Sequence, residues 1–259
     1  ARSYDVYPTK EDFWECFDHV DYSDDIYVGY RYFETIPGAK AQVRYPFGFG
    51  LSYTAFTLSD LLVFAHNGKI VVTVNVTNTG RVAGKETVQV YYSAPQGLLG
   101  KPAKQLAAFK KTKTLQPGET ETLLLTFDIA NMASFDDLGK VQKSAYVLEK
   151  GEYTFHIGTS VRDTQTADYV YEVNENTVTA QYKNWCRPFK LAKRMLSDGS
   201  FEALPQEEPS YYYGEVAPSG AKAPETLVKF DDVGEKCTLD EFVAQMTLDE
   251  LMYIVGGQK

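Results

Sequence analysis

The fold of this chain is decided by two runs, residues 69–77, Lys-Ile-Val-Val-Thr-Val-Asn-Val-Thr, and residues 86–92, Glu-Thr-Val-Gln-Val-Tyr-Tyr. Apolar and polar residues alternate over much of both runs. A period of two places every second side chain on one face of a β-strand. In the second run this period puts Val88, Val90 and Tyr92 on the same face. Two strands, each with one buried face, are therefore predicted.

Further strand-like runs and turns follow this stretch. Residues 115–119, Leu-Gln-Pro-Gly-Glu, have Pro and Gly at positions that turns favour, and residues 122–127 after them are strand-like. Residues 150–152 form another turn signal before the run 153–158. About six or seven two-faced strands over roughly 100 residues are typical of an immunoglobulin-like β-sandwich. The central fold is therefore predicted to be mainly β.

The first part of the chain mixes helical and extended patterns. Thr9, followed by Lys-Glu-Asp-Phe-Trp, predicts a short helix that begins at an N-cap threonine. Residues 26–33, Ile-Tyr-Val-Gly-Tyr-Arg-Tyr-Phe, are rich in β-formers. Residues 45–50 then bring one proline and two glycines. A strand or loop entering a turn is predicted here.

The last part of the chain changes from a linker to helices. Residues 205–224 are rich in Pro, Ser, Gly and Ala, and their tyrosine triplet, 211–213, is interpreted as part of a linker that docks on a neighbouring domain. Residues 238–241 and 247–250 both read Thr-Leu-Asp-Glu, the pattern of a capping box. Two consecutive short helices are therefore predicted.

Eight apolar residues of these two helices are predicted to be buried. They are Leu239, Phe242, Val243, Met246, Leu251, Met252, Ile254 and Val255. A helix with such an apolar face requires another surface to pack on. A further domain or chain is therefore expected to supply that surface.

Composition and charge narrow the classes of partner. The chain has 259 residues and a formal net charge of −9, which argues against nucleic acid or an anionic membrane as partner. A neutral ligand fits better. Aromatic residues make up 14% of the chain, including 19 Tyr, and suit sugar stacking as well as β-sheet cores. The structural role is the favoured interpretation.

The cysteines and histidines show no pattern of a metal or nucleophilic site. The three cysteines are Cys16, Cys186 and Cys237, and the three histidines are His19, His66 and His156. The cysteines are odd in number and far apart, which favours a reducing compartment over a disulfide framework. A cytoplasmic location, with no metal and no cofactor, is therefore predicted.

Two motifs resemble glycoside hydrolase family 3. Residues 27–33, Tyr-Val-Gly-Tyr-Arg-Tyr-Phe, and 45–56, Tyr-Pro-Phe-Gly-Phe-Gly-Leu-Ser-Tyr-Thr-Ala-Phe, are similar to the junction between that family's α/β sandwich domain and its fibronectin type III-like domain. Residues 105–111 and 151–160 resemble later landmarks of the same sandwich. Residues 239–251 resemble the start of the family's (β/α)8 barrel domain.

The resemblance implies a division of the chain into four parts. Residues 1–54 would be the C-terminal part of the α/β sandwich domain, and 55–163 the fibronectin type III-like domain. Residues 164–230 would be an extension and linker, and 231–259 the start of the barrel domain. With the barrel last, the order resembles that of the family's inverted β-glucosidases.

The resemblance also implies that this chain carries no catalytic residue. A retaining glycosidase needs two carboxylates about 5–5.5 Å apart. In this family the nucleophilic aspartate comes from the barrel and the acid/base glutamate from the α/β sandwich domain, and neither is matched here. Among local carboxylates, Asp21, Asp24, Asp25 and Glu34 are interpreted as exposed loop or cap charges, one of which could pair with Arg31.

The predicted function is a noncatalytic structural segment of a retaining β-glucosidase. Its partners would be the remaining domains or chain of the same enzyme and a β-glucoside bound outside this chain. The sandwich would brace the two catalytic domains, because a displacement near 1 Å between reacting groups is costly. Two alternatives stay open, a free carbohydrate-binding or adhesion module and a β-xylosidase of the same family.

Overall fold

The computed structural model describes residues 22–183, 191–206 and 221–256. The chain divides into two compact units, residues 1–206, here called the sandwich unit, and residues 207–259, here called the tail unit. The helix predicted at Thr9 and the tyrosine triplet 211–213 lie outside the described residues.

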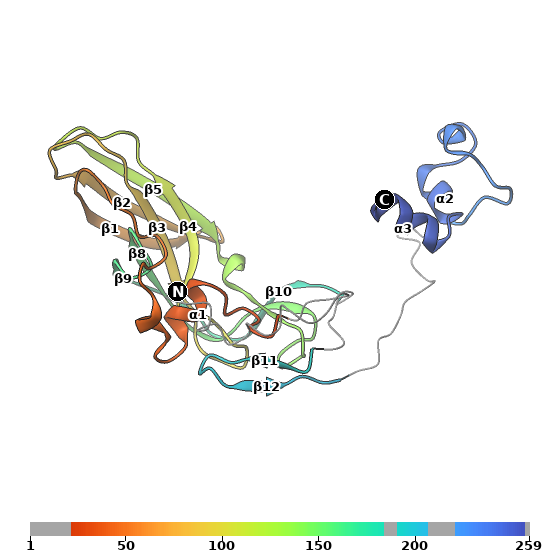
Figure 1. The fold of residues 1–259 in the computed structure, drawn as a ribbon, viewed down its shortest axis with the longest axis horizontal. Helices are drawn as coiled ribbons and strands as arrows, with labels where there is room; N and C mark the ends of the chain where they lie inside the picture. The colour runs from red at the N-terminus through yellow and green to blue at the C-terminus, as the bar shows by residue number, and fades with distance from the viewer. Residues whose placement is uncertain (1–21, 184–190, 207–220, 257–259) are drawn as a thin grey trace. The chain divides into compact units, whose positions relative to one another are not determined.

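Two antiparallel sheets build most of the sandwich unit (Figure 1). The first has the order β1-β2-β5, with β1 (Phe56–His66), β2 (Lys69–Asn78) and β5 (Thr120–Asp128). The second has the order β4-β3-β8-β9, with β3 (Thr87–Ser93), β4 (Gln105–Lys111), β8 (Gly151–Gly158) and β9 (Thr164–Val173). The predicted mainly β fold is confirmed, and the second sheet continues past residue 163 through β9.

The core between the sheets follows the alternation in the sequence. Val72, Val74 and Val76 of β2 are at most 1% exposed, and Val88 and Val90 of β3 are fully buried. All five belong to one apolar cluster. Burying a side chain of this kind stabilises a fold by about 1.5–3 kcal/mol. The period of two therefore translates directly into the two facing layers of the sandwich.

Residues with positive φ, mostly glycines, make the tight turns between strands. Asn67 and Gly68 join β1 to β2 with φ values of 48° and 73°. Positive φ at both central residues is what a two-residue hairpin turn with the correct twist requires. Gly118 has φ 79° in the turn predicted at residues 115–119.

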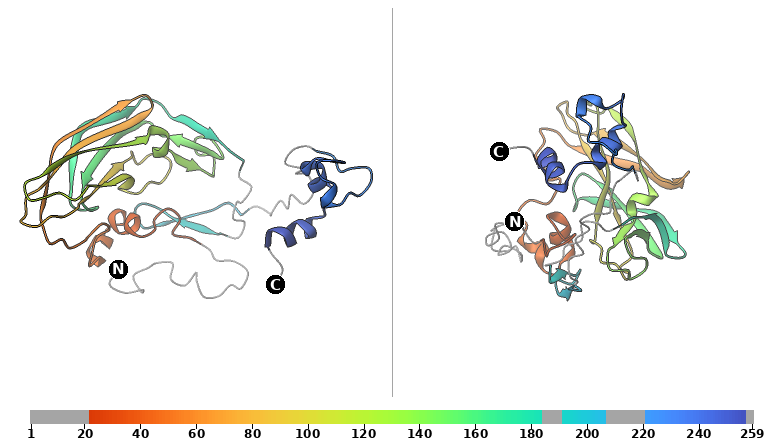
Figure 2. Two further views of the ribbon diagram at one scale, coloured as in Figure 1. Left: turned by 90° about the horizontal axis from the view of Figure 1, so that it is seen from above. Right: turned by 90° about the vertical axis from the view of Figure 1, so that its right-hand side faces the viewer.

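Smaller elements extend the sandwich unit. A three-stranded sheet has the order β10-β7-β6, with β6 (Ser134–Asp136), β7 (Ala145–Leu148) and β10 (Thr177–Gln181). A hairpin joins β11 (Lys193–Met195) to β12 (Phe201–Ala203). Figure 2 shows this hairpin beside helix α1 (Tyr30–Thr35), and Met195 shares a buried cluster with Tyr32 and Phe33 of α1. Short 3-10 turns occupy Ala39–Gln42 and Ile129–Met132.

The segment 26–33 is not a strand, which corrects the expectation from its composition. Its second half forms α1, which begins after Gly29 with φ 58°. Tyr32 and Phe33 are buried, and Tyr30 stacks on Phe47 with ring centroids 4.7 Å apart. Aromatic residues favour strands only where they meet a pleated surface. Here they pack as one face of a short helix instead.

The tail unit contains the two predicted helices, α2 (Leu239–Ala244) and α3 (Leu248–Gly256), after a 3-10 turn at Phe230–Asp232. Four of the eight residues expected to be buried are exposed within the described chain, so their burial stays a prediction that depends on a further domain or chain. They are Leu239 at 54%, Met252 at 62%, Ile254 at 66% and Val255 at 88% exposure. No part of the chain that the structure describes covers them.

Candidate pocket of the sandwich unit

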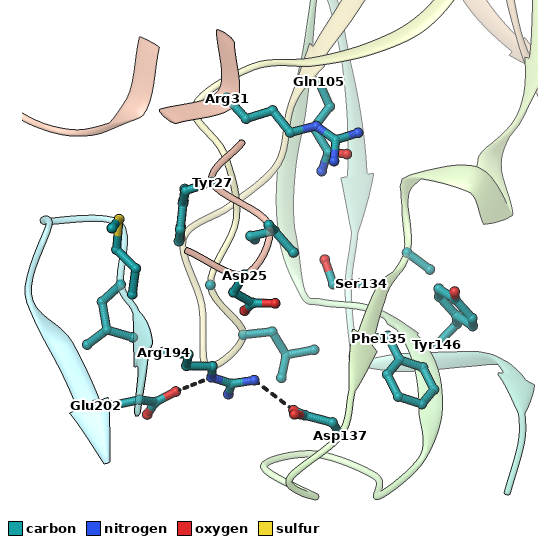
Figure 3. A pocket seen from close by; sticks show the side chains of 16 residues that line it. Asp25, Tyr27, Arg31, Gln105, Ser134, Phe135, Asp137, Tyr146, Arg194 and Glu202 are labelled. Carbon is teal, nitrogen blue, oxygen red and sulfur yellow. Dashed lines mark hydrogen bonds and ion pairs between the residues drawn. The ribbon is translucent and has the colours of Figure 1, made fainter. Parts of the chain in front are cut away.

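An arginine holds together three separate elements on one side of the sandwich unit. Arg194 of β11 donates from Nε to Glu202 of β12 at 2.7 Å and from Nη1 to Asp137, just after β6, at 2.8 Å (Figure 3). Lys140 donates to the same Glu202 carboxylate at 3.0 Å. These salt bridges fix the β11–β12 hairpin to the loop after β6. The acidic partners also raise the pKa of Arg194 and outweigh the opposing effect of its burial.

The loop after β6 is organised by Asp136. This side chain is completely buried and accepts hydrogen bonds from the backbone N–H groups of Gly139, Lys140, Val141 and Gln142 at 2.6–3.0 Å. Burial alone would raise the pKa of Asp136, but these donors favour the carboxylate and lower it. The loop is thereby wrapped around one charge, and it presents Asp137 and Lys140 to the hairpin.

A pocket of about 430 Å³ is lined in part by Arg194, Asp137 and Glu202. Four further polar residues line it, Asp25, Arg31, Gln105 and Ser134 (Figure 3). Asp25 lies in the turn before α1, and the other three residues come from α1, β4 and β6. Three segments that are distant in sequence, around residues 25–31, 105 and 134, therefore bring polar side chains to one cavity.

The polar groups of these four side chains have no hydrogen-bond partner among the described residues. No hydrogen bond or ion pair joins the carboxylate of Asp25, the guanidinium of Arg31, the amide of Gln105 or the hydroxyl of Ser134 to another described residue. Asp25 opens to the pocket, yet the surrounding protein limits its hydration and raises its pKa. Arg194 opposes this shift, and Asp137 and Glu202 add to it.

The apolar part of the pocket includes a pair of aromatic rings. Phe135 of β6 and Tyr146 of β7 have centroids 5.2 Å apart at an interplanar angle of 59°. They are 37% and 42% exposed, and both line the cavity. Figure 3 shows them on the opposite side of the pocket from Tyr27. The pocket thus combines an aromatic side with a polar one.

The carboxylates singled out in the sequence do not form one site. Asp24 is buried beside Asp25, while Asp21 lies outside the described residues. Glu34 accepts from Nε of Arg162 at 2.6 Å and lies 3.8 Å from the Lys40 ammonium. Glu34 therefore works as an anchor of α1 on the sandwich, away from the Asp25 pocket. Among the described residues, no ion pair joins Arg31 to any of these carboxylates.

His156 forms a short polar chain that resembles part of a hydrolytic triad. Its Nε2 lies 3.0 Å from Ser93 Oγ, and its Nδ1 lies 3.0 Å from Thr166 Oγ1. Ser93 donates its hydroxyl proton to the carbonyl of Ala103 at 2.6 Å, so the histidine does not accept that proton. Burial lowers the pKa of His156 to about 4, and nearby Lys104 adds to this effect. The chain is a structural link between strands.

The remaining sequence candidates are scattered. His66 ends β1, and Cys237 carries a free thiol in the tail unit. His19, Cys16 and Cys186 lie outside the described residues. Within the described ranges, no three His, Cys, Asp or Glu side chains are grouped as metal ligands would be. No helix there is long and apolar enough to cross a bilayer.

Asp25 and Arg31 were noted in the sequence only as loop or cap charges, and the pocket itself was not predicted. Gln105 begins the motif 105–111, whereas Ser134 and Arg194 belong to no motif, and these three residues lie tens of positions apart. The one local signal is the acidic pair at residues 136–137, just before a glycine and a lysine. Adjacent acids in a loop are usually solvated, so only the folded chain shows that one is buried and the other holds an arginine.

This chain is similar to a known domain family and to segments of longer proteins. A model of the fibronectin type III-like domain matches residues 86–161. "Beta-glucosidase A" of Butyrivibrio fibrisolvens is 47% identical over 100% of this chain and 36% of that protein. A "Beta-glucosidase" of Ruminococcus albus is 39% identical over 99% of this chain and 28% of that protein. The chain thus spans about a third of the length of these relatives.

Solved structures agree with these relatives. A β-glucosidase from Paenibacillus barengoltzii superposes with a TM-score of 0.76 and 38% identity, covering 98% of this chain and 30% of that one. A glycoside hydrolase family 3 β-glucosidase from Bifidobacterium adolescentis gives a TM-score of 0.57 and 33% identity, covering 70% of this chain and 26% of that one. This chain therefore belongs to glycoside hydrolase family 3, as a segment that contains the fibronectin type III-like domain.

Proposed function

We propose that this chain is a noncatalytic segment of a retaining β-glucosidase and braces its two catalytic domains. The observation that carries the proposal is the match over the whole chain to "Beta-glucosidase A", of which it spans 36%. The catalytic nucleophile and the acid/base residue are then supplied by other parts of the enzyme. No residue of this chain is assigned a catalytic, metal-binding or cofactor-binding role.

The junction before the sandwich supports a bracing role because it is fixed to the sandwich at several points. The hydroxyl of Tyr30 accepts from the N–H of Leu106 at 2.9 Å, and the hydroxyl of Thr35 accepts from the N–H of Ala103 at 2.8 Å. The Arg162–Glu34 ion pair adds a third link. A segment that is bonded to a rigid element at several points is itself held in a fixed position. An α/β domain joined through α1 would therefore be held in a fixed orientation.

The exposed apolar face of α3 supports the second contact of the brace. Met252, Ile254 and Val255 are each at least 62% exposed. Apolar helix faces of this kind normally pack on another element. We infer that residues 231–259 begin the (β/α)8 barrel, whose later parts cover this face. The boundaries 1–54, 55–163 and 164–230 and the inverted domain order belong to the same proposal.

The substrate and the compartment follow from the relatives and the cysteines. The relatives compared above are named β-glucosidases, which favours a β-glucoside over a β-xyloside as substrate. Cys237 carries a free thiol, in keeping with a reducing, cytoplasmic compartment. The remaining domains of the enzyme are the partners of this segment.

A chimeric enzyme tests the proposal. The matching segment of the Butyrivibrio fibrisolvens protein is replaced by this chain, and hydrolysis of p-nitrophenyl β-D-glucoside and of the corresponding β-D-xyloside is measured. We expect an active chimera with preference for the glucoside, and no hydrolysis by this chain alone.

Two controls make the result decisive. A chimera without residues 55–163 is expected to lose activity and to melt at a lower temperature. If that deletion leaves both unchanged, the sandwich is no brace. If this chain alone hydrolyses the glucoside, the noncatalytic role is wrong and the carboxylates Asp24, Asp25 and Glu34 become the first candidates for mutation.

A further inference from the structure

The pocket beside Arg194 is not explained by a bracing role. Among the described residues, no hydrogen bond or ion pair satisfies the side chains of four residues that face it, while Arg194 is paired with Glu202 and Asp137. The four are Asp25, Arg31, Gln105 and Ser134. Arg31, Gln105 and Ser134 are half-buried, whereas Asp25 is exposed. Polar groups that are partly removed from water cost free energy unless water or a ligand satisfies them. A structural joint would gain more from apolar residues at these positions. The polar lining is therefore a feature that a bound molecule would use.

The charges of the uncommitted groups indicate a neutral ligand. Arg31 and Asp25 carry opposite charges, and Gln105 and Ser134 are uncharged. The guanidinium only donates and the carboxylate only accepts, whereas the amide and the hydroxyl do both. Neither a cation nor an anion would satisfy this set. A molecule with several hydroxyl groups would, because each hydroxyl can donate and accept.

The aromatic side of the pocket narrows the class further. Phe135 and Tyr146 present partly exposed rings to the cavity. A pyranose ring has an apolar C–H face and hydroxyls around its edge, so it can contact rings on one side and hydrogen-bond on the other. The volume of about 430 Å³ is within the range of roughly 300–1,000 Å³ found for small-molecule sites.

We propose that this pocket is a noncatalytic binding site for one pyranose unit of a neutral mono- or disaccharide. Arg31 and Gln105 hold hydroxyls at one end, Asp25 and Ser134 hold them along the side, and Phe135 with Tyr146 contacts the ring face. The choice of a glucose-type sugar rests on the proposed function, whereas the pocket's preference for a neutral polyhydroxy ring rests on its own lining.

Binding by the 259-residue chain tests this site directly, because no catalytic pair is assigned to it. Backbone amide resonances are followed by NMR during titration with glucose, cellobiose and, as an acyclic polyol, sorbitol. We expect saturable shifts for the two sugars, centred on residues 25–31, 105 and 134, and no saturable shift for sorbitol.

Matched glutamine variants connect the signal to the pocket. Gln105→Leu keeps the size of the side chain and removes its hydrogen bonds, and it is expected to raise the Kd for cellobiose at least tenfold. Gln116→Leu makes the same change on an exposed turn and is expected to leave the Kd unchanged. Ser134→Ala provides a second pocket variant with little risk to folding.

Several outcomes would overturn the site. They are the absence of saturable shifts, shifts centred elsewhere on the sandwich, or equal Kd values for Gln105→Leu and Gln116→Leu. Loss of the sugar-dependent shifts at residues 25–31, 105 and 134 in the active chimera would show that another domain of the enzyme occupies the pocket, which also contradicts a sugar site. Binding by the chain alone does not depend on hydrolysis by the chimera. If the chimera is inactive but the chain alone binds sugar, the proposed function is refuted and this site is retained.

Discussion

The two units of this chain place their apolar residues in opposite environments. Val72 and Ile157 of the sandwich unit are at most 1% exposed, whereas Ile254 and Val255 of the tail unit are 66% and 88% exposed. Apolar residues recur every second position in the strands, and in the tail Met252 and Val255 lie three positions apart, as neighbours on one helix face do. The difference is that the sandwich unit contains its own partner sheet. The sandwich is therefore expected to hold its core by itself, and the tail to depend on a surface from elsewhere.

The largest expected effect comes from comparing a buried ion pair with an exposed one. In the sandwich unit Lys101 pairs with Glu149, and their side chains are 1% and 3% exposed. Glu149 also accepts from the N–H groups of Leu98 and Leu99 at 2.6 and 3.1 Å. Lys101→Met leaves that carboxylate buried without its cation, so it is expected to lower the free energy of unfolding by about 3–5 kcal/mol.

The control for this prediction lies in the tail unit. Lys236 pairs with Asp232 at 2.9 Å, but the lysine is 63% exposed. Lys236→Met is expected to change stability by at most about 1 kcal/mol. Urea denaturation followed by circular dichroism measures both variants. If the two variants lowered the free energy of unfolding equally, the buried Lys101–Glu149 pair would matter no more than the exposed one. That result would contradict the expected difference between the two units.

A matched pair of isoleucines gives the next largest effect. Ile157→Ala in β8 removes a side chain that is 1% exposed, and it is expected to cost about 2–5 kcal/mol because a cavity is left in the core. Ile254→Ala in α3 makes the same change at a residue that is 66% exposed. There the effect is expected to stay within about 0.5 kcal/mol.

The same pair of variants can sharpen the comparison in the larger enzyme. In the chimera, Ile254→Ala is expected to become destabilising, because the barrel would then cover that residue. The difference between its effect in the chain alone and in the chimera, measured by thermal melting, reports burial by the partner surface. An unchanged small effect in the chimera would contradict the proposed docking of α3.

How far the sequence predicts this molecule depends on the distance between the residues involved. The valines of β2 and the capping boxes of α2 and α3 are local patterns, and the structure confirms the strands and helices they predict. The prediction of a strand or loop around Tyr30 was wrong, because the packing partners of this ring, Phe47 and Tyr91, come from other segments. The pocket needed contacts such as Arg194 with Asp137, 57 residues apart, which no local period encodes.

The smallest expected effect compares two carboxylates held by backbone N–H groups. Asp136 in the sandwich unit accepts four such bonds and is fully buried, whereas Glu241 accepts the N–H of Thr238 at 2.8 Å on the surface of the tail. These bonds lower the pKa of both groups, although burial opposes the shift at Asp136. Loss of the charge therefore has to matter more where water cannot replace the donors.

Asp136→Asn is expected to cost about 1.5–3 kcal/mol at neutral pH, the range for hydrogen bonds to a charged group. Because the folded pKa lies below the ordinary value of 3.8, the stabilisation is complete above that pH and is lost as the pH falls through the folded pKa. Urea unfolding between neutral and strongly acidic pH should thus show a drop near the acid end for the parent chain. The variant should show a smaller drop there, and Glu241→Gln should leave that of the sandwich unchanged. Equal acid sensitivity of the parent and Asp136→Asn would contradict the role of Asp136 as the buried charge that organises the loop after β6.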